Sequence, residues 1–439
     1  MSQRKHLHSI HVDHNKHTPN CATEVMPIPD FVRISMSQHI GAPCTPVVKK
    51  GDYVKVGQLL GDSDAFVSAP IYSGVSGTVT GIETDRSGNG GSEKVVVIET
   101  DKKQEISESI AVPSPKDHKE FVEQVRRSGA VGLGGAAFPT HVKFAPSNLD
   151  EVDTLIINGA ECEPFITSDH RTMLEDTQDV IDGLVLTAKF LGVKKTYIGI
   201  ENNKPDAIEK FRTMLSEQKI DNVEVVELRS RYPQGAERVM IYEVTGRVMD
   251  AGVLPAQLGV ILSNVTTTAF LGQFFRTGMP LINKRITVDG SAVATPKNVL
   301  VPIGTKISDV IEFCGGYKEE PKKLIMGGPM MGRAIYSDQM SIVKNNNAIL
   351  AFGEKEAFLP QETACINCGR CHFACPFELM PTEYYDAYKR RDAKKLEELK
   401  VNQCMECGSC SYVCPARRPL SFVNKLSKAY LKEVADSGK

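Results

Sequence analysis

The 439-residue sequence has no tryptophan, a low aromatic content of 7% and a net charge of only -2. It lacks any apolar run approaching the roughly 20 residues that span a bilayer, and its N-terminus lacks the apolar core of a signal peptide. The near-neutral charge is unlike the basic footprint of nucleic-acid-binding proteins, so no nucleic-acid partner is expected. We therefore expect several folded domains, with the thiols in a reducing cytoplasm.

Cysteine is concentrated near the C-terminus, where eight of the twelve residues form two copies of C-x2-C-x2-C-x3-C-P. Iron–sulfur clusters are held by thiolates, and this spacing is typical of proteins with two [4Fe–4S] clusters, in which each fourth cysteine ligates the other cluster. The predicted first cluster site is Cys365, Cys368, Cys371 and Cys414. The predicted second cluster site is Cys404, Cys407, Cys410 and Cys375.

Two other uses of these cysteines are structural zinc and disulfide bonds. Zinc takes four ligands and could use two C-x2-C pairs, but it explains neither the third interval nor the proline after each fourth cysteine. Disulfides would require an oxidising compartment. Iron–sulfur clusters are therefore the favoured interpretation. The remaining cysteines are scattered, and we interpret them as small apolar packing residues.

The N-terminal half begins with a polar segment and a predicted β-rich domain. Residues 1–25 carry His6, His8, His11, His14 and His17. Such a tract can bind metal, but we favour a flexible tail that lies against a neighbouring domain. Residues 26–112 read as short strands broken by glycine turns, and they resemble the barrel-sandwich hybrid of biotinyl and lipoyl carriers. No lysine occurs between Lys55 and Lys94, so we predict a scaffold rather than a swinging arm.

Residues 113–275 alternate strands and helices, which predicts an α/β domain with a mainly parallel sheet. Predicted strands are Thr154–Ile157, Lys195–Ile200 and Val223–Leu228, and predicted helices are Thr177–Leu191 and Lys204–Glu217. In such sheets ligands bind beyond the carboxyl ends of the strands. Polar or glycine-rich patches occur at Gly132–Lys143, Asn158–Pro164, Tyr232–Glu237 and Ser263–Thr267. Glycines let backbone N–H groups approach a phosphate, although the dinucleotide G-x-G-x-x-G spacing is absent.

These four patches, in this order, resemble the NADH-binding flavoprotein subunit of respiratory complex I. The resemblance implies a Rossmann-like FMN/NAD domain. The implied FMN contacts are Gly132, Gly134, Lys143, Asn158, Glu161, Gly235 and Asn264. The implied NADH-facing residues are Gly135, Ala136, Phe138, Glu163, Tyr232 and Glu237.

Several positions depart from that family. Leu133 replaces an arginine, Ala137 a glycine and Ser263 an asparagine, while Ala160 and Ala236 replace carboxylates. A scaffold that wires electrons without binding NADH therefore stays open as an alternative.

The C-terminal part reads as two further modules. Residues 276–354 resemble a β-grasp module of the soluble-ligand-binding type, and residues 355–439 form the ferredoxin domain. Helices are predicted over Pro381–Lys400 and Leu420–Val434. The second has an apolar stripe with lysines outside it, for which core packing or partner docking is favoured over membrane contact.

The complete order of modules, a multidomain α/β and α+β arrangement, resembles the C subunit of the Rnf electron-transport complexes, which are membrane-bound ferredoxin:NAD+ oxidoreductases. The resemblance implies two [4Fe–4S] clusters and FMN as cofactors, with NAD(H) as substrate. It also implies other Rnf subunits as partners, ferredoxin indirectly, and a peripheral place on the cytoplasmic face of the membrane. Partner subunits would couple electron flow to Na+ or H+ translocation. A soluble cobalamin reductase of propanediol utilisation is a second alternative. The cofactors carry the chemistry, so no catalytic side chain is predicted.

Overall fold

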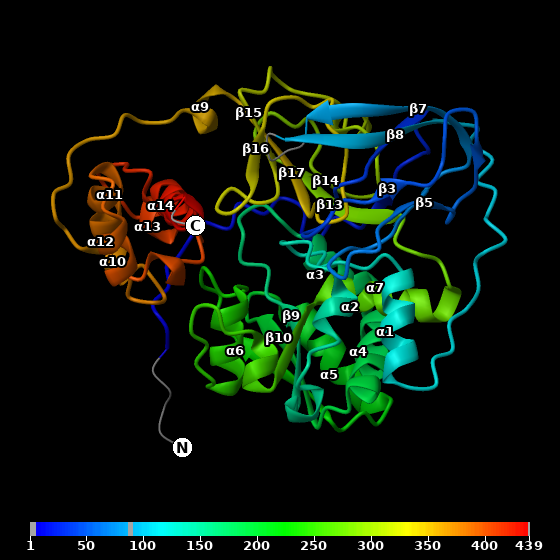
Figure 1. Ribbon diagram of the computed structural model, residues 1–439, viewed down its shortest axis with the longest axis horizontal. Helices are drawn as coiled ribbons and strands as arrows, with labels where there is room; N and C mark the ends of the chain where they lie inside the picture. Colours follow the sequence, from blue (N-terminus) through cyan, green and yellow to red (C-terminus); the bar gives the residue numbers. More distant parts are fainter. Residues whose placement is uncertain (1–5, 87–90, 438–439) are drawn as a thin grey trace.

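A computed structural model describes residues 6–86 and 91–437. The chain forms four modules, with the cluster domain set to one side of the other three (Figure 1). The first module is a barrel-sandwich of two small antiparallel sheets around a core that includes Val32, Ile34, Val79 and Ile98. One sheet has the order β2 (Phe31–Ser35), β8 (Ser92–Thr100), β7 (Gly77–Arg86), β4 (Tyr53–Val54), and the other β3 (Thr45–Pro46), β5 (Leu59–Asp62), β6 (Ile71–Tyr72).

The second module is a parallel four-stranded sheet between two helical layers. Its order is β11 (Val223–Leu228), β10 (Lys195–Glu201), β9 (Thr154–Gly159), β12 (Val260–Asn264). Successive side chains of a strand point to opposite faces. Leu155 and Ile157 therefore pack on one helical layer, and Ile156 packs on the other, against Met240 and Ile241. The helices are α1 (His118–Arg127), α2 (Thr140–Lys143), α3 (Ser168–Glu175), α4 (Thr177–Leu191), α5 (Pro205–Glu217), α6 (Glu237–Thr245) and α7 (Val265–Thr277).

Two glycines set how closely the central helices of this module approach. A Cβ on Gly183 of α4 would lie 2.0 Å from the carbonyl oxygen of Thr268, and one on Gly272 of α7 would lie 2.1 Å from that of Asp179. Real Cβ atoms do not approach a backbone oxygen so closely, so neither position accepts a larger residue without moving a helix. This close packing against α4 fixes the position of α7, and of the polar turn before it, on the sheet.

The third module is built on a mixed sheet that also receives a strand from the N-terminal segment. Its order is β1 (Glu24–Val25), β14 (Lys297–Pro302), β13 (Asn283–Asp289), β17 (Ala348–Phe352), β15 (Lys323–Met326), β16 (Arg333–Ile335). β1 pairs with β14 in parallel. Helix α8 (Ile307–Phe313) covers the sheet, and α9 (Glu354–Ala357) begins the connection to the last module.

The fourth module is all helical and holds both cysteine motifs. The predicted helix over Pro381–Lys400 is divided, because Arg391 has a φ of 54° and Asp392 caps the next helix through a bond from the Lys395 N–H. Helix α14 packs inward through Leu420, Val423 and Leu431, whereas Phe422 and Val434 of the predicted apolar stripe are exposed. No helix within residues 6–86 and 91–437 is long and apolar enough to cross a membrane. The helices are α10 (Arg370–Phe373), α11 (Pro381–Lys389), α12 (Ala393–Glu398), α13 (Ser409–Tyr412) and α14 (Leu420–Ser437).

The N-terminal segment lies against neighbouring modules, as expected, and part of it is buried there. Ile10, Val12 and Thr18 are buried, and the Lys16 side chain is only 11% exposed. The polar composition concealed this packing because only two of the buried side chains, Ile10 and Val12, are apolar, and the others are Lys16 and Thr18. We call residues 6–18 the N-terminal strap.

Candidate flavin and cluster sites

The four patches predicted to form one pocket meet at the carboxyl edge of the parallel sheet. Asn158 is the last but one residue of β9, Asn264 ends the adjacent strand β12, and the two are paired in register. The Asn158 amide donates to the carbonyl oxygen of Gly235 at 2.8 Å, and the Leu133 N–H donates to the Thr267 hydroxyl at 3.0 Å. Parallel strands bring their carboxyl ends to one edge, which is where ligands bind in folds of this class.

The glycine-rich loop leaves room where a side chain would collide. A Cβ on Gly134 would lie 2.3 Å from the Asn264 amide nitrogen, and one on Gly235 would lie 2.9 Å from the Ala160 carbonyl oxygen. Gly134, Gly135 and Ala136 form the exposed tip of the loop. The close glycine backbone fits a flat ring or a phosphate packed directly on the main chain.

Polar groups at this edge keep hydrogen-bonding capacity for a ligand. The Lys143 ammonium donates to the Leu262 carbonyl oxygen at 3.0 Å and lies 3.4 Å from the Glu237 carboxylate. Its side chain is 30% exposed, so the charge can also meet a phosphate. The Gln234 amide nitrogen is buried and has no partner among the described residues. Such an orphan donor fits a pocket that receives a polar ligand.

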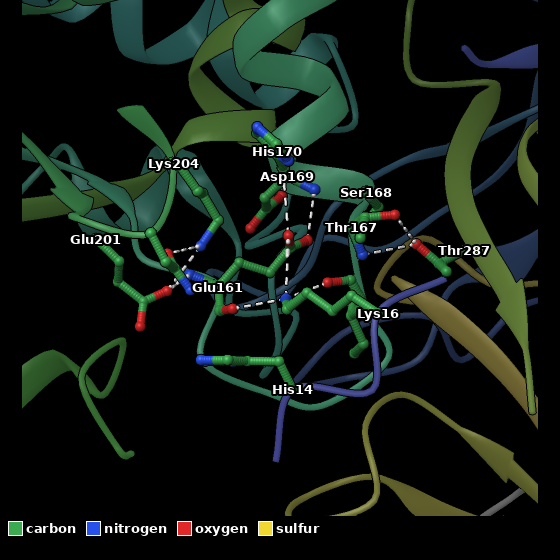
Figure 2. Close-up of polar contacts among 12 residues, drawn as sticks. His14, Lys16, Glu161, Thr167, Ser168, Asp169, His170, Glu201, Lys204 and Thr287 are labelled. Atoms are coloured by element: carbon green, nitrogen blue, oxygen red, sulfur yellow. Dashed lines mark hydrogen bonds and ion pairs between the residues drawn. The ribbon is translucent and has the colours of Figure 1, made fainter. Parts of the chain in front are cut away.

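Glu161, a predicted FMN contact, lies in a buried ionic network (Figure 2). Its carboxylate accepts the N–H of Asp169 at 2.7 Å, and the Lys16 ammonium lies 3.6 Å away while donating to the Glu161 carbonyl oxygen. Burial raises the pKa of Glu161 above its usual range, and the nearby Lys16 charge opposes that rise.

Two charged residues that sequence reasoning missed complete the network. Lys204 and Glu201 pair at 2.8 Å, and the Glu201 carboxylate also accepts the Glu161 N–H at 3.0 Å. Glu201 ends β10 and Lys204 immediately precedes α5. The sequence pattern that could have revealed these two residues is a pair of opposite charges at the carboxyl end of strand β10, which neighbours β9. This network fixes the Asn158–Pro164 segment, and the FMN contact of Glu161 stays a prediction.

Two predicted NADH-facing residues reach the other modules. The Glu163 carboxylate accepts the N–H groups of Met330 and Met331 at 3.0 and 2.8 Å, and burial raises the pKa of Glu163 to about 7. The Tyr232 ring is buried, and its hydroxyl donates to the Cys407 carbonyl oxygen at 2.6 Å. Phe138 is half-buried beside the glycine loop. The roles of these side chains toward NADH stay predictions.

Cysteines of both motifs lie near one another at each predicted cluster site, and the full crossed assignment stays a prediction. Cys375 lines one cavity together with Cys404, Cys407 and Cys410. At the other site, Cys371 lies near enough to Cys414 and Cys365 for their charges to add to the burial that raises its pKa. Thiolates from both motifs therefore face each site, which is the donor set of two iron–sulfur clusters.

The two cluster sites differ in burial. Cys407 and Cys410 of the second site are buried, whereas Cys368 of the first site is exposed. The Cys404 sulfur accepts bonds at 3.4 Å from the Glu406 N–H and the Asn424 amide. Hydrogen bonds to sulfur and solvent exposure set cluster potentials, so we expect the two clusters to differ in potential.

Four family models match the chain. They are the RnfC barrel sandwich hybrid domain at residues 6–103, the Nuo51 FMN-binding domain at 125–272, the SLBB domain at 285–334 and the 4Fe-4S dicluster domain at 359–415. The predicted fold class is confirmed. The chain therefore carries an FMN-binding domain and a domain for two [4Fe–4S] clusters.

Curated relatives match over most of the chain. Identity is 46% to the C subunit of the proton-translocating ferredoxin:NAD(+) oxidoreductase complex of Clostridium ljungdahlii, over 84% of this chain and 81% of that protein. It is 41% to the C subunit of the Na(+)-translocating ferredoxin:NAD(+) oxidoreductase complex of Acetobacterium woodii, over 84% of each. It is 37% to the C subunit of the ion-translocating oxidoreductase complex of Rhodobacter capsulatus, over 85% and 73%.

A solved structure, NAD+-reducing [NiFe]-hydrogenase in the H2-reduced state, shares the fold. It matches at 18% identity and a TM-score of 0.51, over 71% of this chain and 60% of that one.

Proposed function

Because the chain belongs to the RnfC family, the C subunits of ion-translocating ferredoxin:NAD+ oxidoreductase (Rnf) complexes, we propose that it moves electrons between NAD(H), FMN and two [4Fe–4S] clusters. The observation that carries this function is the contact between the flavin pocket and a cluster site, the Tyr232–Cys407 bond. When bound, FMN exchanges hydride with nicotinamide and single electrons with clusters, so it links the two kinds of carrier. It is an oxidoreductase subunit of the translocase class.

The chain's own residues bind and orient these groups. Gly132 and Gly134 allow the backbone to approach the flavin, and Lys143 places positive charge for its phosphate. The Asn158 and Asn264 side chains hold the pocket's edges together. No side chain here needs to transfer a proton, so the protein's part is placement and electrostatics.

NADH binding is the part of the function with a specific rival. Ala160 and Ala236 lack carboxylates, and Glu163 and Tyr232 already bond the other modules. These observations favour the electron-wiring scaffold as the second candidate. A carboxylate has about four lone-pair sites, so Glu163 retains capacity to accept ribose hydroxyls as well.

Other subunits of an Rnf complex are the proposed partners, with ferredoxin reached indirectly. The relatives are named as the C subunits of such complexes. In the cluster domain, Ile366, Phe373 and Phe422 are 68, 66 and 61% exposed. Exposed apolar side chains are candidates for contact with other proteins. The proposed location is peripheral, on the cytoplasmic face of the membrane, where partner subunits couple electron flow to Na+ or H+ translocation.

Anaerobic purification followed by cofactor analysis and NADH titration tests the function. We expect FMN, with about eight iron atoms and eight labile sulfides per chain for two four-iron clusters. Stoichiometric NADH should bleach the flavin absorbance. If the flavin is bound but NADH does not bleach it, the scaffold function replaces this one. Zinc in place of iron would refute the clusters.

A further inference from the structure

The N-terminal strap runs along the boundary of three modules. At its start, His8 lies 3.8 Å from Glu378 of the cluster domain. Further on, the His14 carbonyl oxygen accepts the Phe165 N–H of the flavin domain at 2.8 Å. Near its end, His17 bonds Asp289 of β13 at 2.9 Å. One short segment thus contacts the cluster, flavin and β-grasp modules in succession.

The middle of the strap completes an apolar core between the flavin and cluster modules. Ile10 and Val12 are buried there with Tyr232, Ala374 and Cys407. Exposed His11 separates the two buried residues, so the strap presents alternate side chains to the interface as an extended segment does. The strap is therefore part of the packing that joins the two modules.

Tyr232 connects the strap to the second cluster site. Its N–H and carbonyl groups bond those of Ile10, both at 2.9 Å, and its hydroxyl bonds the Cys407 carbonyl oxygen. Nearby, the Arg238 guanidinium lies 3.8 Å from the centre of the Phe377 ring and donates to the Gln403 carbonyl oxygen at 2.9 Å. The cluster-domain partners, Cys407, Phe377 and Gln403, lie in or next to the loops that carry Cys375 and Cys404–Cys410.

The covalent connection to the cluster domain gives little support of its own. Residues 358–364 are exposed and form no helix or strand. Phe358 and Leu359 are among the most exposed apolar side chains of the described chain. An extended, solvated linker does not fix the position of the domain that it carries. Non-covalent contacts must therefore fix the position. Those at Ile10, Val12, Tyr232 and Arg238 are joined by Met330, which packs with Cys407, and by the Ala251 N–H, which donates to the Gln403 side chain at 3.1 Å.

We propose that the N-terminal strap holds the second cluster site against the flavin pocket, and that this site is the pocket's direct electron partner. The first cluster site, with exposed Cys368, then faces other proteins. Each transfer moves one electron between the pocket and the second site and moves no atom. This inference rests on the proposed function for its electron transfer, but the positioning of the cluster domain can be tested without it.

The test compares Ile10→Asp with the matched control His11→Asp in the full, reconstituted chain. Both variants add the same carboxyl group, at a buried and at the adjacent exposed position. Burying an unpaired carboxylate is costly, and each factor of ten in a docking equilibrium needs only about 1.4 kcal/mol. Ile10→Asp should therefore lose amide-exchange protection at residues 230–234 and 404–413, whereas His11→Asp should keep it.

Rapid-kinetic measurements test the effect of the same variants on electron transfer. In Ile10→Asp, NADH should bleach the flavin at the original rate, while cluster reduction, followed by rapid-freeze EPR, should slow by at least about tenfold. Ile10→Ala removes the apolar contact without adding charge, so it should reduce amide-exchange protection and slow cluster reduction by less than Ile10→Asp does. It replaces Ile10→Asp in the test if that variant does not fold. Protection and cluster reduction equal to those of His11→Asp would overturn the proposal. If NADH bleaches no flavin in the unaltered chain, the proposed function fails, and amide exchange still decides the role of the strap.

Discussion

Replacing Gly134 by alanine perturbs the flavin pocket at a single point. The new Cβ would lie 2.3 Å from the Asn264 amide nitrogen, so the Asn264 side chain must move. That side chain caps α7 by accepting the N–H groups of Thr266 and Thr267, and it donates to Asp169 at 2.8 Å. Loss of the cap costs about 1 kcal/mol, and loss of a hydrogen bond to a carboxylate adds about 2 kcal/mol. We therefore expect Gly134→Ala to lower the free energy of unfolding by about 1 to 3 kcal/mol.

Gly135→Ala is the matched control, because a Cβ on Gly135 meets no atom within 4 Å. Urea unfolding, followed by circular dichroism, should show Gly135→Ala close to the unaltered chain and Gly134→Ala clearly less stable. FMN affinity, measured from quenching of flavin fluorescence, should fall in Gly134→Ala because Asn264 is a predicted FMN contact. Equal unfolding free energies and equal FMN affinities in the two variants would refute the reasoning.

Three further predictions concern other parts of the chain. Cys414→Ala should reduce the iron content from about eight to about four atoms, and the EPR spectrum of the remaining cluster should match that of Cys368→Ala. A match to Cys407→Ala would mean that the fourth cysteines are not crossed. The pKa of Glu163 is raised to about 7 from 4.5, so the folded chain holds this proton more tightly and stability should fall as pH rises through that interval. The free energy of unfolding should fall by at most about 3 kcal/mol. Urea unfolding at pH 5 and pH 8 should show that Glu163→Gln removes this pH dependence. The same pH dependence in Glu163→Gln would contradict the raised pKa of Glu163. Lys204→Met leaves the buried Glu201 carboxylate without its ion pair and should cost about 3 to 5 kcal/mol, whereas Lys204→Met with Glu201→Leu should recover most of it in the same assay.

Local patterns were enough to predict the α/β module and the convergence of its polar patches. The predicted helix Thr177–Leu191 and strand Val223–Leu228 match α4 and β11. Asn158 and Asn264 could be placed together because strand polarity alone brings the carboxyl ends of parallel strands to one edge. The cluster cysteines were predicted because thiolate spacing follows the geometry of the cluster, whatever surrounds it.

Contacts between distant segments could not be predicted in the same way. The strap buries only two apolar residues, Ile10 and Val12, from a polar stretch, and nothing near them in sequence indicates that Tyr232 and Cys407 cover them. Lys16 gave no sign of an ionic partner because its role depends on Glu161, in another module. Periodicity reports which face of an element is buried, but it does not report what buries it.

The strap also orders the events by which the chain is made. Ile10 is synthesised early, but its partner Cys407 follows 397 residues later, which is roughly 20 to 80 s at ribosomal rates. During that interval the barrel, flavin and β-grasp modules can fold as units, while the strap lacks its last binding site. The cluster-carrying loops thus emerge onto a body that is already formed. Delivery of iron and sulfide to the second site therefore has its best opportunity before the cluster domain docks against the strap.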